Sequence, residues 1–331
     1  MSSIPKAVLY YSSESIWSSA VLLALEEKGY GADEVDLRVV DLNKGGNFDP
    51  SFLRLNNKAI VPTLVVPLQK TLSVAVESRY RAITDSKAII EFLDKSRSPW
   101  SQTHTTSQAP APSLTPATIA FTETSAEMIE LIHTEEANPD NLRYMNARDV
   151  DSLRSLAREL LPVLHARRDV LSKHISDANS GTIQVSEKVT AFWKEKQAAI
   201  EVLVGLYKNA DISESALEPG EKTKRAEYFE MAKSARASLG RTLLRLEKDV
   251  IGPFALGDQL SIADMHLSSW LARIVKLAGG AATDDGIAVV GRLQHYVGTD
   301  FKLGEKSRLS EYWEAMKGRP SWNKVYAEGL H

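Results

Sequence analysis

The chain of 331 residues contains no cysteine. This absence excludes disulfides, cysteine-ligated zinc and every reaction in which the protein's own thiol is the nucleophile. No two of its histidines lie at the i, i+4 spacing that places two imidazoles on one helix face, so no metal site is expected. The loops G-x-G-x-x-G, Walker-type G-K-S/T and G-x-S-x-G are also missing, which disfavours nucleotide chemistry and serine hydrolysis.

Excess charge and long hydrophobic runs are absent as well. Lys and Arg number 40 against 43 Asp and Glu, a balance that disfavours general binding to nucleic acid. No apolar run approaches the ~20 residues that a membrane span needs, and the first residues lack the pattern of a secretory signal. We therefore expect a cytoplasmic protein with no membrane span.

Composition divides the chain at residues 98–116, which are rich in Ser, Thr, Pro and Gln and predict a linker. Before it, residues 1–97 alternate short β-prone runs with two helical segments, in an order typical of a two-layer α/β domain. Behind it, residues 117–331 predict an all-α domain, and Pro162 is expected to kink or end its helix near Leu161. The long helices are expected at residues 149–175, 187–208, 222–250 and 262–277.

Ser15 stands among several serines at the start of the first predicted helix, 15–28. Free N–H groups and the positive end of the helix dipole favour an anion such as a thiolate there. A hydroxyl could donate a hydrogen bond to that thiolate and lower its pKa. The alternative is that one serine simply caps the helix.

Two further features follow in the order that a peptide site would need. A cis Val61–Pro62 bond would turn the Val61 N–H and C=O outward to pair with an extended peptide, whereas a trans bond would only mark the entry to a strand. Asp85 and Ser86 open another helix, where they could hold the ammonium and carboxylate of a ligand or merely cap the helix. Together these features describe a pocket for a small zwitterionic thiol peptide.

These segments resemble the glutathione S-transferase superfamily. The resemblance implies a thioredoxin-like α/β domain that binds glutathione, followed by an all-α domain in which Ser261 and Asp264 form the capping box of a buried helix. The resemblance is weak over residues 139–225, where this chain has additional helices, and over residues 67–80, where it has a lengthened hairpin. Both insertions are reminiscent of fungal members of the superfamily. The residues that carry the resemblance are Leu9-Tyr10-Tyr11, 24–29, Val61-Pro62-Thr63-Leu64, 85–93, 254–264 and 319–322.

The resemblance also implies roles for individual residues. Ser15 falls on the activating position of theta-, zeta- and omega-like members, with Ser18 where a C-x-x-C motif would have its second cysteine and Tyr11 as the rival activating residue. Phe121, Ser125 and Met128 would line a second-substrate pocket, although such a stripe is also typical of a core. Lys58 would reach the glycyl carboxylate or remain a solvated loop charge. The glutathione contacts implied are Ser15, Trp17, Lys58, Val61, Pro62, Asp85 and Ser86.

The function implied is conjugation of the glutathione thiolate, as co-substrate, to an apolar electrophile in detoxification, or reduction of an organic hydroperoxide. Without cysteine the protein cannot form a mixed disulfide with glutathione. The alternatives are a non-catalytic ligandin or regulatory binding protein, and an interaction module in which the enlarged helical half is the working part. By analogy with the family we expect a homodimer.

Overall fold

A computed structural model describes residues 6–67, 80–98, 107–304 and 306–331. Most of the predicted lengthened hairpin 67–80, and part of the predicted linker 98–116, lie outside these residues. The chain forms two compact units, one of Met1–Val39, Val61–Asp140 and Arg236–His331 and one of Val40–Ile60 and Asn141–Ala235. The domain boundaries 1–97, 98–116 and 117–331 stay predictions.

The first unit contains a four-stranded sheet with the strand order β2-β1-β3-β4. β1 and β2 are parallel, as a crossover through a helix requires, whereas β1 with β3 and β3 with β4 are antiparallel. The predicted succession βαβ and then ββα is confirmed, and the N-terminal part has the thioredoxin-like arrangement. The strands are β1 (Ala7–Tyr11), β2 (Val35–Val39), β3 (Thr63–Pro67) and β4 (Tyr80–Ile83).

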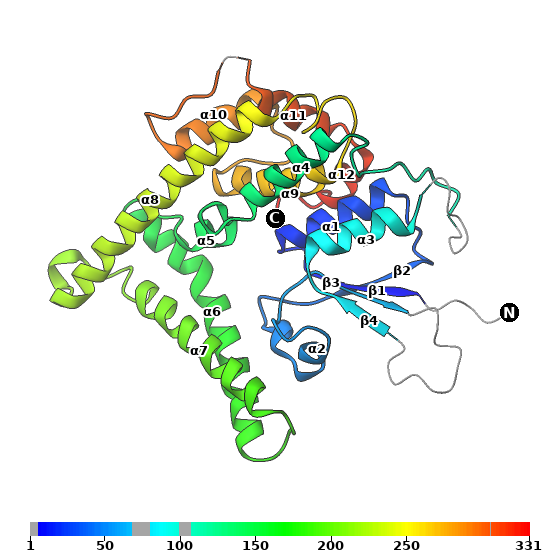
Figure 1. The fold of residues 1–331 in the computed structure, drawn as a ribbon. Coiled ribbons are helices and arrows are strands. Elements are labelled where there is room, and N and C mark those ends of the chain that lie inside the picture. The colour runs from blue at the N-terminus through cyan, green and yellow to red at the C-terminus, as the bar shows by residue number, and fades with distance from the viewer. Residues whose placement is uncertain (1–5, 68–79, 99–106, 305) are drawn as a thin grey trace. The chain divides into compact units, whose positions relative to one another are not determined.

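Two helices, α1 (Ile16–Glu27) and α3 (Ser86–Ser96), pack together and cover one face of this sheet (Figure 1). Leu9 of β1 and Leu64 of β3 are paired in register and completely buried. α1 ends at Glu27, and Gly29, just after the C-cap Lys28, has a φ of 66°, the left-handed conformation that glycine adopts without a Cβ clash. At their other ends, α1 has Ser15 as its N-cap and α3 has Asp85.

The helical part of the first unit is organised around α9 (Ile262–Leu277), which is buried along nearly its whole length and packs against α1 and α4. The predicted capping box is confirmed, because Asp264 accepts hydrogen bonds from the N–H groups of Ala255 and Ser261, both at 2.7 Å. The other helices are α4 (Ile119–Ile132), the end of α8 (Pro219–Asp249), α10 (Gly286–Val297), α11 (Arg308–Lys317) and α12 (Pro320–Val325).

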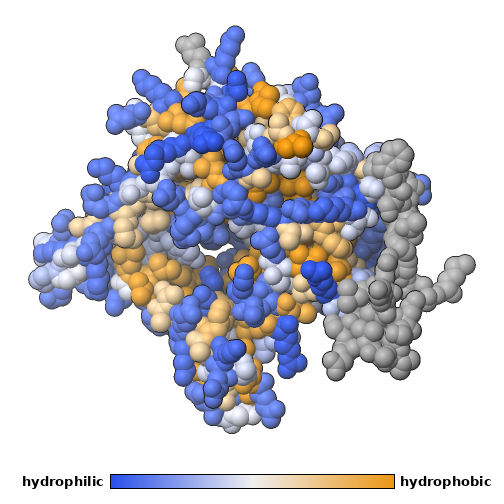
Figure 2. All heavy atoms as spheres, in the orientation of Figure 1, coloured by the Kyte–Doolittle hydropathy of each residue, from blue (hydrophilic) through white to orange (hydrophobic). Residues whose placement is uncertain are grey.

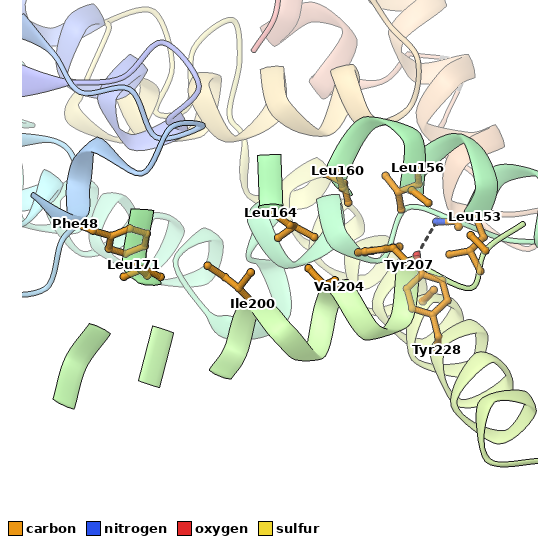
Figure 3. Packing of buried hydrophobic residues seen from close by; sticks show 14 of the residues in the cluster. Phe48, Leu153, Leu156, Leu160, Leu164, Leu171, Ile200, Val204, Tyr207 and Tyr228 are labelled. Atoms are coloured by element: carbon orange, nitrogen blue, oxygen red, sulfur yellow. Dashed lines mark hydrogen bonds between the residues drawn. The ribbon is translucent and has the colours of Figure 1, made fainter. Parts of the chain in front are cut away.

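The second unit joins the segment between β2 and β3 to the long helices α6 (Val150–Asn179) and α7 (Glu187–Tyr207). The indole of Trp193 is fully buried and donates a hydrogen bond to the Phe48 carbonyl at 3.1 Å. Figure 3 shows Phe48 beside Leu171 of α6, and both belong to one core with the other leucines of that helix. The remaining helices of the unit are α2 (Pro50–Leu55), which the sequence analysis did not predict, part of α5 (Pro139–Tyr144) and the start of α8.

Pro162 lies inside α6, and the helix continues through it, so the alternative that the helix ends near Leu161 is wrong. Proline removes one donor from the hydrogen-bond ladder. Leu160 and Leu164, on either side of it, are almost completely buried in the core of this unit. Burial of the apolar face of α6 therefore outweighs the loss of one backbone hydrogen bond.

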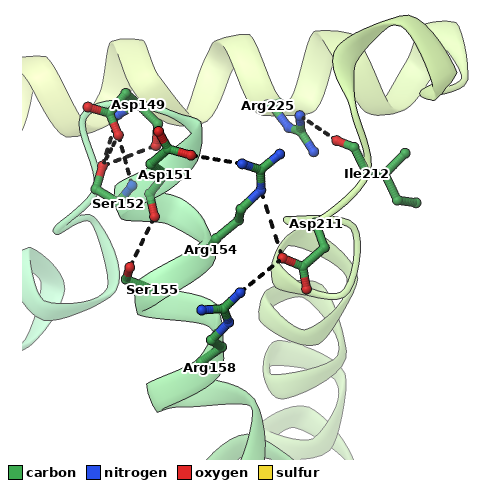
Figure 4. A network of polar contacts seen from close by, with 9 residues as sticks. All are labelled: Asp149, Asp151, Ser152, Arg154, Ser155, Arg158, Asp211, Ile212 and Arg225. Carbon is green, nitrogen blue, oxygen red and sulfur yellow. Dashed lines mark hydrogen bonds and ion pairs between the residues drawn. The ribbon is translucent and has the colours of Figure 1, made fainter.

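The surface of the second unit carries ion pairs that are open to solvent. Arg154 lies 2.8 Å from Asp151 and 3.8 Å from Asp211, and Arg158 is also 3.8 Å from Asp211 (Figure 4). Val202 on α7 is exposed, and the face of the molecule drawn in Figure 2 mixes hydrophobic and hydrophilic residues. Exposed pairs of this kind contribute little to stability, and nothing in them indicates chemistry.

Candidate functional site

Ser15 is held at the first turn of α1 by a closed set of hydrogen bonds. Its N–H donates to the Ser12 carbonyl at 3.1 Å, and its Oγ accepts from the Ser18 N–H at 3.3 Å. The Ser18 hydroxyl in turn accepts from the Ser12 N–H at 3.3 Å, and this side chain is fully buried. Ser15 therefore caps the helix, while Ser18 supports the turn from inside.

Capping leaves the Ser15 proton available, and the structure directs it toward the proline segment. The Ser15 Oγ donates to the Val61 carbonyl at the long distance of 3.4 Å. The Val61–Pro62 peptide bond is cis. Within the described residues, the Val61 N–H has no protein acceptor. A peptide that pairs with Val61 would consequently place its own side chain near the Ser15 hydroxyl.

Asp85 and Ser86 open α3 in the same unit. The exposed Asp85 carboxylate accepts from the Ala88 N–H at 3.0 Å and so caps the helix with one oxygen. Ser86 is buried, and its hydroxyl has no protein partner among the residues that the structure describes. One carboxylate oxygen and one hydroxyl at a helix N-terminus are groups that can bind an ammonium and a carboxylate, respectively.

Two aromatic residues lie beside Ser15 in the sequence. Tyr11, the rival to Ser15, is partly buried at the end of β1, and its hydroxyl makes no hydrogen bond within the described part of the chain. The Trp17 ring stacks on the His133 imidazole, with ring centroids 3.7 Å apart and planes within 15°. The activating role of Tyr11 stays a prediction. The predicted glutathione contact of Trp17 also stays a prediction, and its ring packs against the end of α4.

His133 belongs to a pair of imidazoles that the sequence analysis did not single out. Its Nε2 lies 3.1 Å from Nδ1 of the fully buried His266, on α9. Burial, helped by the nearby Lys87 charge, lowers the pKa of His133 to about 4, and burial lowers the pKa of His266 well below its usual value. Both rings are therefore neutral at pH 7, when one of the two facing nitrogens donates and the other accepts.

The remaining predicted residues fall into two groups. Ser125 and Met128 are buried in the face of α4 that packs on α9, whereas Phe121 is exposed. The stripe therefore contributes mostly to the core, and its role toward a second substrate stays a prediction. Lys58 is exposed and belongs to the second compact unit, so its predicted contact with glutathione also stays a prediction.

Arg273 on α9 is a further residue that sequence reasoning missed. It is buried, and its guanidinium donates to the carbonyl of Glu14, the residue before Ser15. A lone arginine inside the apolar run of residues 270–275 is the signal that could have identified it.

No helix in the described ranges has the length and apolarity needed to cross a bilayer. No three His, Asp or Glu side chains within those same ranges converge as metal ligands would.

A family model and a curated relative each match part of the chain. The model of the family "Glutathione S-transferase, N-terminal domain" matches residues 14–96. Tetrachloro-p-hydroquinone reductive dehalogenase of Sphingobium chlorophenolicum is 44% identical over 64 residues, which cover 19% of this chain and 25% of that relative. The match thus spans about a quarter of the length of the curated relative.

Solved structures resemble the whole chain. The β-etherase LigF from Sphingobium sp. strain SYK-6 superposes with a TM-score of 0.55 at 14% identity, covering 98% of this chain and 100% of that chain. Glutathione transferase F7 from Populus trichocarpa gives a TM-score of 0.51 at 16% identity, with 98% and 99% covered. Residues 14–96 thus match a glutathione S-transferase N-terminal domain, and the chain shares its fold with these solved structures.

Proposed function

We propose that this protein is a glutathione transferase that binds glutathione along Val61 and Pro62 and presents its thiolate beside Ser15. The observation that carries the proposal is the Ser15 hydroxyl directed at the Val61 carbonyl across 3.4 Å, at the N-terminus of α1. The cysteinyl backbone of the tripeptide would pair with Val61, and its γ-glutamyl group would bind at Asp85 and Ser86.

The chemistry then follows from the local groups. The thiol of bound glutathione loses its proton to solvent, and the Ser15 hydroxyl gives up its long bond to the Val61 carbonyl and donates its one proton to the resulting thiolate. The helix dipole stabilises the same negative charge. The sulfur attacks an electrophilic carbon, a C–S bond forms, and the leaving group departs with the electrons of its bond. The protein contributes ionisation and proximity, with no covalent intermediate.

The second substrate is proposed to be an apolar electrophile. The matching stretch of the curated relative belongs to an enzyme named for a chlorinated hydroquinone, and the fold of the chain is shared with an etherase. Because this chain has no cysteine, a thiol that reacts in its site must come from glutathione. These points favour displacement of a leaving group from an aromatic or activated carbon, with hydroperoxide reduction as a second activity.

The cellular setting is also a proposal. A homodimer in the cytosol, acting in detoxification, fits the family. A ligandin would bind glutathione at the same site but would not catalyse a reaction. The rate of conjugation therefore distinguishes a ligandin from a transferase.

Calorimetry and turnover test the proposal together. The wild-type chain should bind glutathione, and at saturating glutathione it should conjugate chlorodinitrobenzene faster than the uncatalysed reaction. The matched control is S-methylglutathione, which keeps the peptide contacts and should bind but not react. Binding without turnover of chlorodinitrobenzene or of an organic hydroperoxide would favour the ligandin. No binding of either peptide would refute the proposal.

A further inference from the structure

The carbonyl group that immediately precedes the Ser15 N-cap is held from the helical part of the same unit. Nη2 of Arg273 donates to the Glu14 carbonyl at 2.5 Å, and Nη1 lies 3.2 Å from Oδ1 of Asp140. Arg273 is only 3% exposed, whereas the side chain of Asp140 is 59% exposed. A buried cation thus lies against the turn, and its acidic partner is largely screened by water.

This placement is unfavourable for the helix by itself. Cations stabilise the C-terminal end of a helix, because the N-terminal end already carries a partial positive charge. Arg273 adds a full positive charge next to the first turn of α1. Such an arrangement becomes favourable when an anion binds at that turn, as the thiolate of the proposed function would.

Hydrogen bonds on both sides of the Glu14–Ser15 peptide group fix the turn before α1. The Glu14–Ser15 peptide group donates through the Ser15 N–H to Ser12 and accepts through its carbonyl from Arg273. Both sides of this peptide are therefore fixed, and the direction of the Ser15 side chain depends on them. A Lys could supply the charge but not the planar fork that reaches Glu14 and Asp140 at once.

We propose that Arg273 is a positioning residue of the thiolate site: its guanidinium fixes the turn that carries the Ser15 hydroxyl, and its charge favours the ionised form of a thiol bound there. The inference rests on the proposed function and adds to it a residue that does not touch the substrate. Arg273 lies on α9, outside the N-terminal domain that supplies the glutathione contacts.

Other charged and titratable groups surround Arg273 and bear on any pH profile. His331 contacts Ser19 in the first turn of α1, at 2.7 Å between Nε2 and Oγ. Burial, with the Arg273 charge, lowers the pKa of His331. The His331 imidazole is therefore already neutral at the pH values where a thiol ionises. Its titration does not overlap that of the thiol in a pH profile. Among the described residues, Arg273 pairs with Asp140 and interacts with Tyr326 and His331, and His331 also interacts with Glu14 and Lys276.

The test measures the apparent pKa of the glutathione thiol from the pH dependence of kcat/KM with chlorodinitrobenzene. Arg273→Gln should raise this pKa by about half a pH unit or more, which lowers the rate below the pKa at least about threefold. Arg273→Lys should restore the pKa but leave kcat reduced, because the charge returns without the fork. Asp140→Asn should move the pKa the opposite way, since it removes the compensating negative charge.

Arg97→Gln is the matched control. Arg97 is equally buried, pairs with Glu34 at 3.3 Å and donates to the Ala109 carbonyl at 2.8 Å, all away from the Ser15 turn. It should lower stability without moving the thiol pKa. An identical profile for wild type and Arg273→Gln overturns the inference alone. If Arg273→Gln does not fold, an unchanged or raised pKa in Asp140→Asn overturns it. A wild-type chain that binds no glutathione refutes the proposed function as well.

Discussion

Replacing Ser15 with alanine removes two separable contributions of one hydroxyl. The side chain accepts the Ser18 N–H at 3.3 Å as the cap of α1, and the loss of such a cap costs about 1 kcal/mol of stability. The same hydroxyl would donate to the thiolate, and a hydrogen bond to a charged group contributes about 1.5–3 kcal/mol. The second contribution equals about 1 to 2 pH units in the pKa of the bound thiol.

The expected kinetic result depends on pH. Starting from the ordinary thiol value of about 8.5, the variant's thiol should remain almost entirely protonated near neutrality. We expect kcat/KM at pH 6.5 to fall about tenfold to a hundredfold and the difference to shrink above pH 9, where the thiol ionises without help. The dissociation constant of glutathione should change little, because the peptide contacts at Val61 and Asp85 remain.

Two control variants separate this effect from destabilisation and from the rival residue. Asp285 caps α10 by accepting the Ala288 N–H at 2.8 Å, so Asp285→Ala loses a comparable cap in the same unit. It should lower the free energy of unfolding by a similar amount and leave the pH profile unchanged. If Tyr11→Phe reproduces the loss and Ser15→Ala does not, Tyr11 is the activating residue and the reasoning from the Ser15 geometry is wrong.

Three further predictions concern binding, acid stability and packing. Asp85→Ala should weaken glutathione binding by about tenfold in calorimetry while kcat changes little, because one charge-assisted hydrogen bond to the ammonium is lost; an unchanged dissociation constant would remove Asp85 from the site. His133, whose folded pKa is about 4 against an ordinary value near 6.5, favours the folded state fully above pH 6.5 and loses that contribution as the pH falls toward 4. Urea unfolding should therefore show a smaller loss of stability between pH 7 and 5 in His133→Gln than in wild type, and equal losses would contradict the assignment. Trp193→Phe leaves the Phe48 carbonyl without its donor and should cost about 1–3 kcal/mol, with Trp193→Tyr no better; a cost below about 0.5 kcal/mol would show that this contact does not hold the second unit together.

Local patterns in the sequence predict the elements that are long or strictly alternating. The predicted strands and the helices α6, α7 and α9 have the bounds that their periodicity indicates, to within a few residues. The helix α2 was missed because six residues are too few to show a period. The continuity of α6 through Pro162 depends on burial of its neighbours, which local rules do not contain.

The residues of the candidate site also divide into those with a local sequence signal and those without one. Ser15, Val61 and Asp85 could be identified because each lies at the boundary of a predicted element, where capping and strand entry leave recognisable residues. His133, His266 and Arg273 could not, because their meaning comes from contacts across more than 130 residues of sequence. A single buried histidine or arginine has no local pattern, so only its tertiary partners identify it.

Each of the two units holds its own segments by buried hydrogen bonds. The Ser15 turn is held within the first unit, where Arg273 of α9 fixes the Glu14 carbonyl. The residues that lead to Val61 are held within the second unit, where Asn47 donates to the Ala59 carbonyl at 2.8 Å and Trp193 of α7 binds the Phe48 carbonyl. A change at α9 should therefore reach thiol ionisation through the Ser15 turn, whereas a change in the packing of α6 and α7 should alter the stability of the second unit.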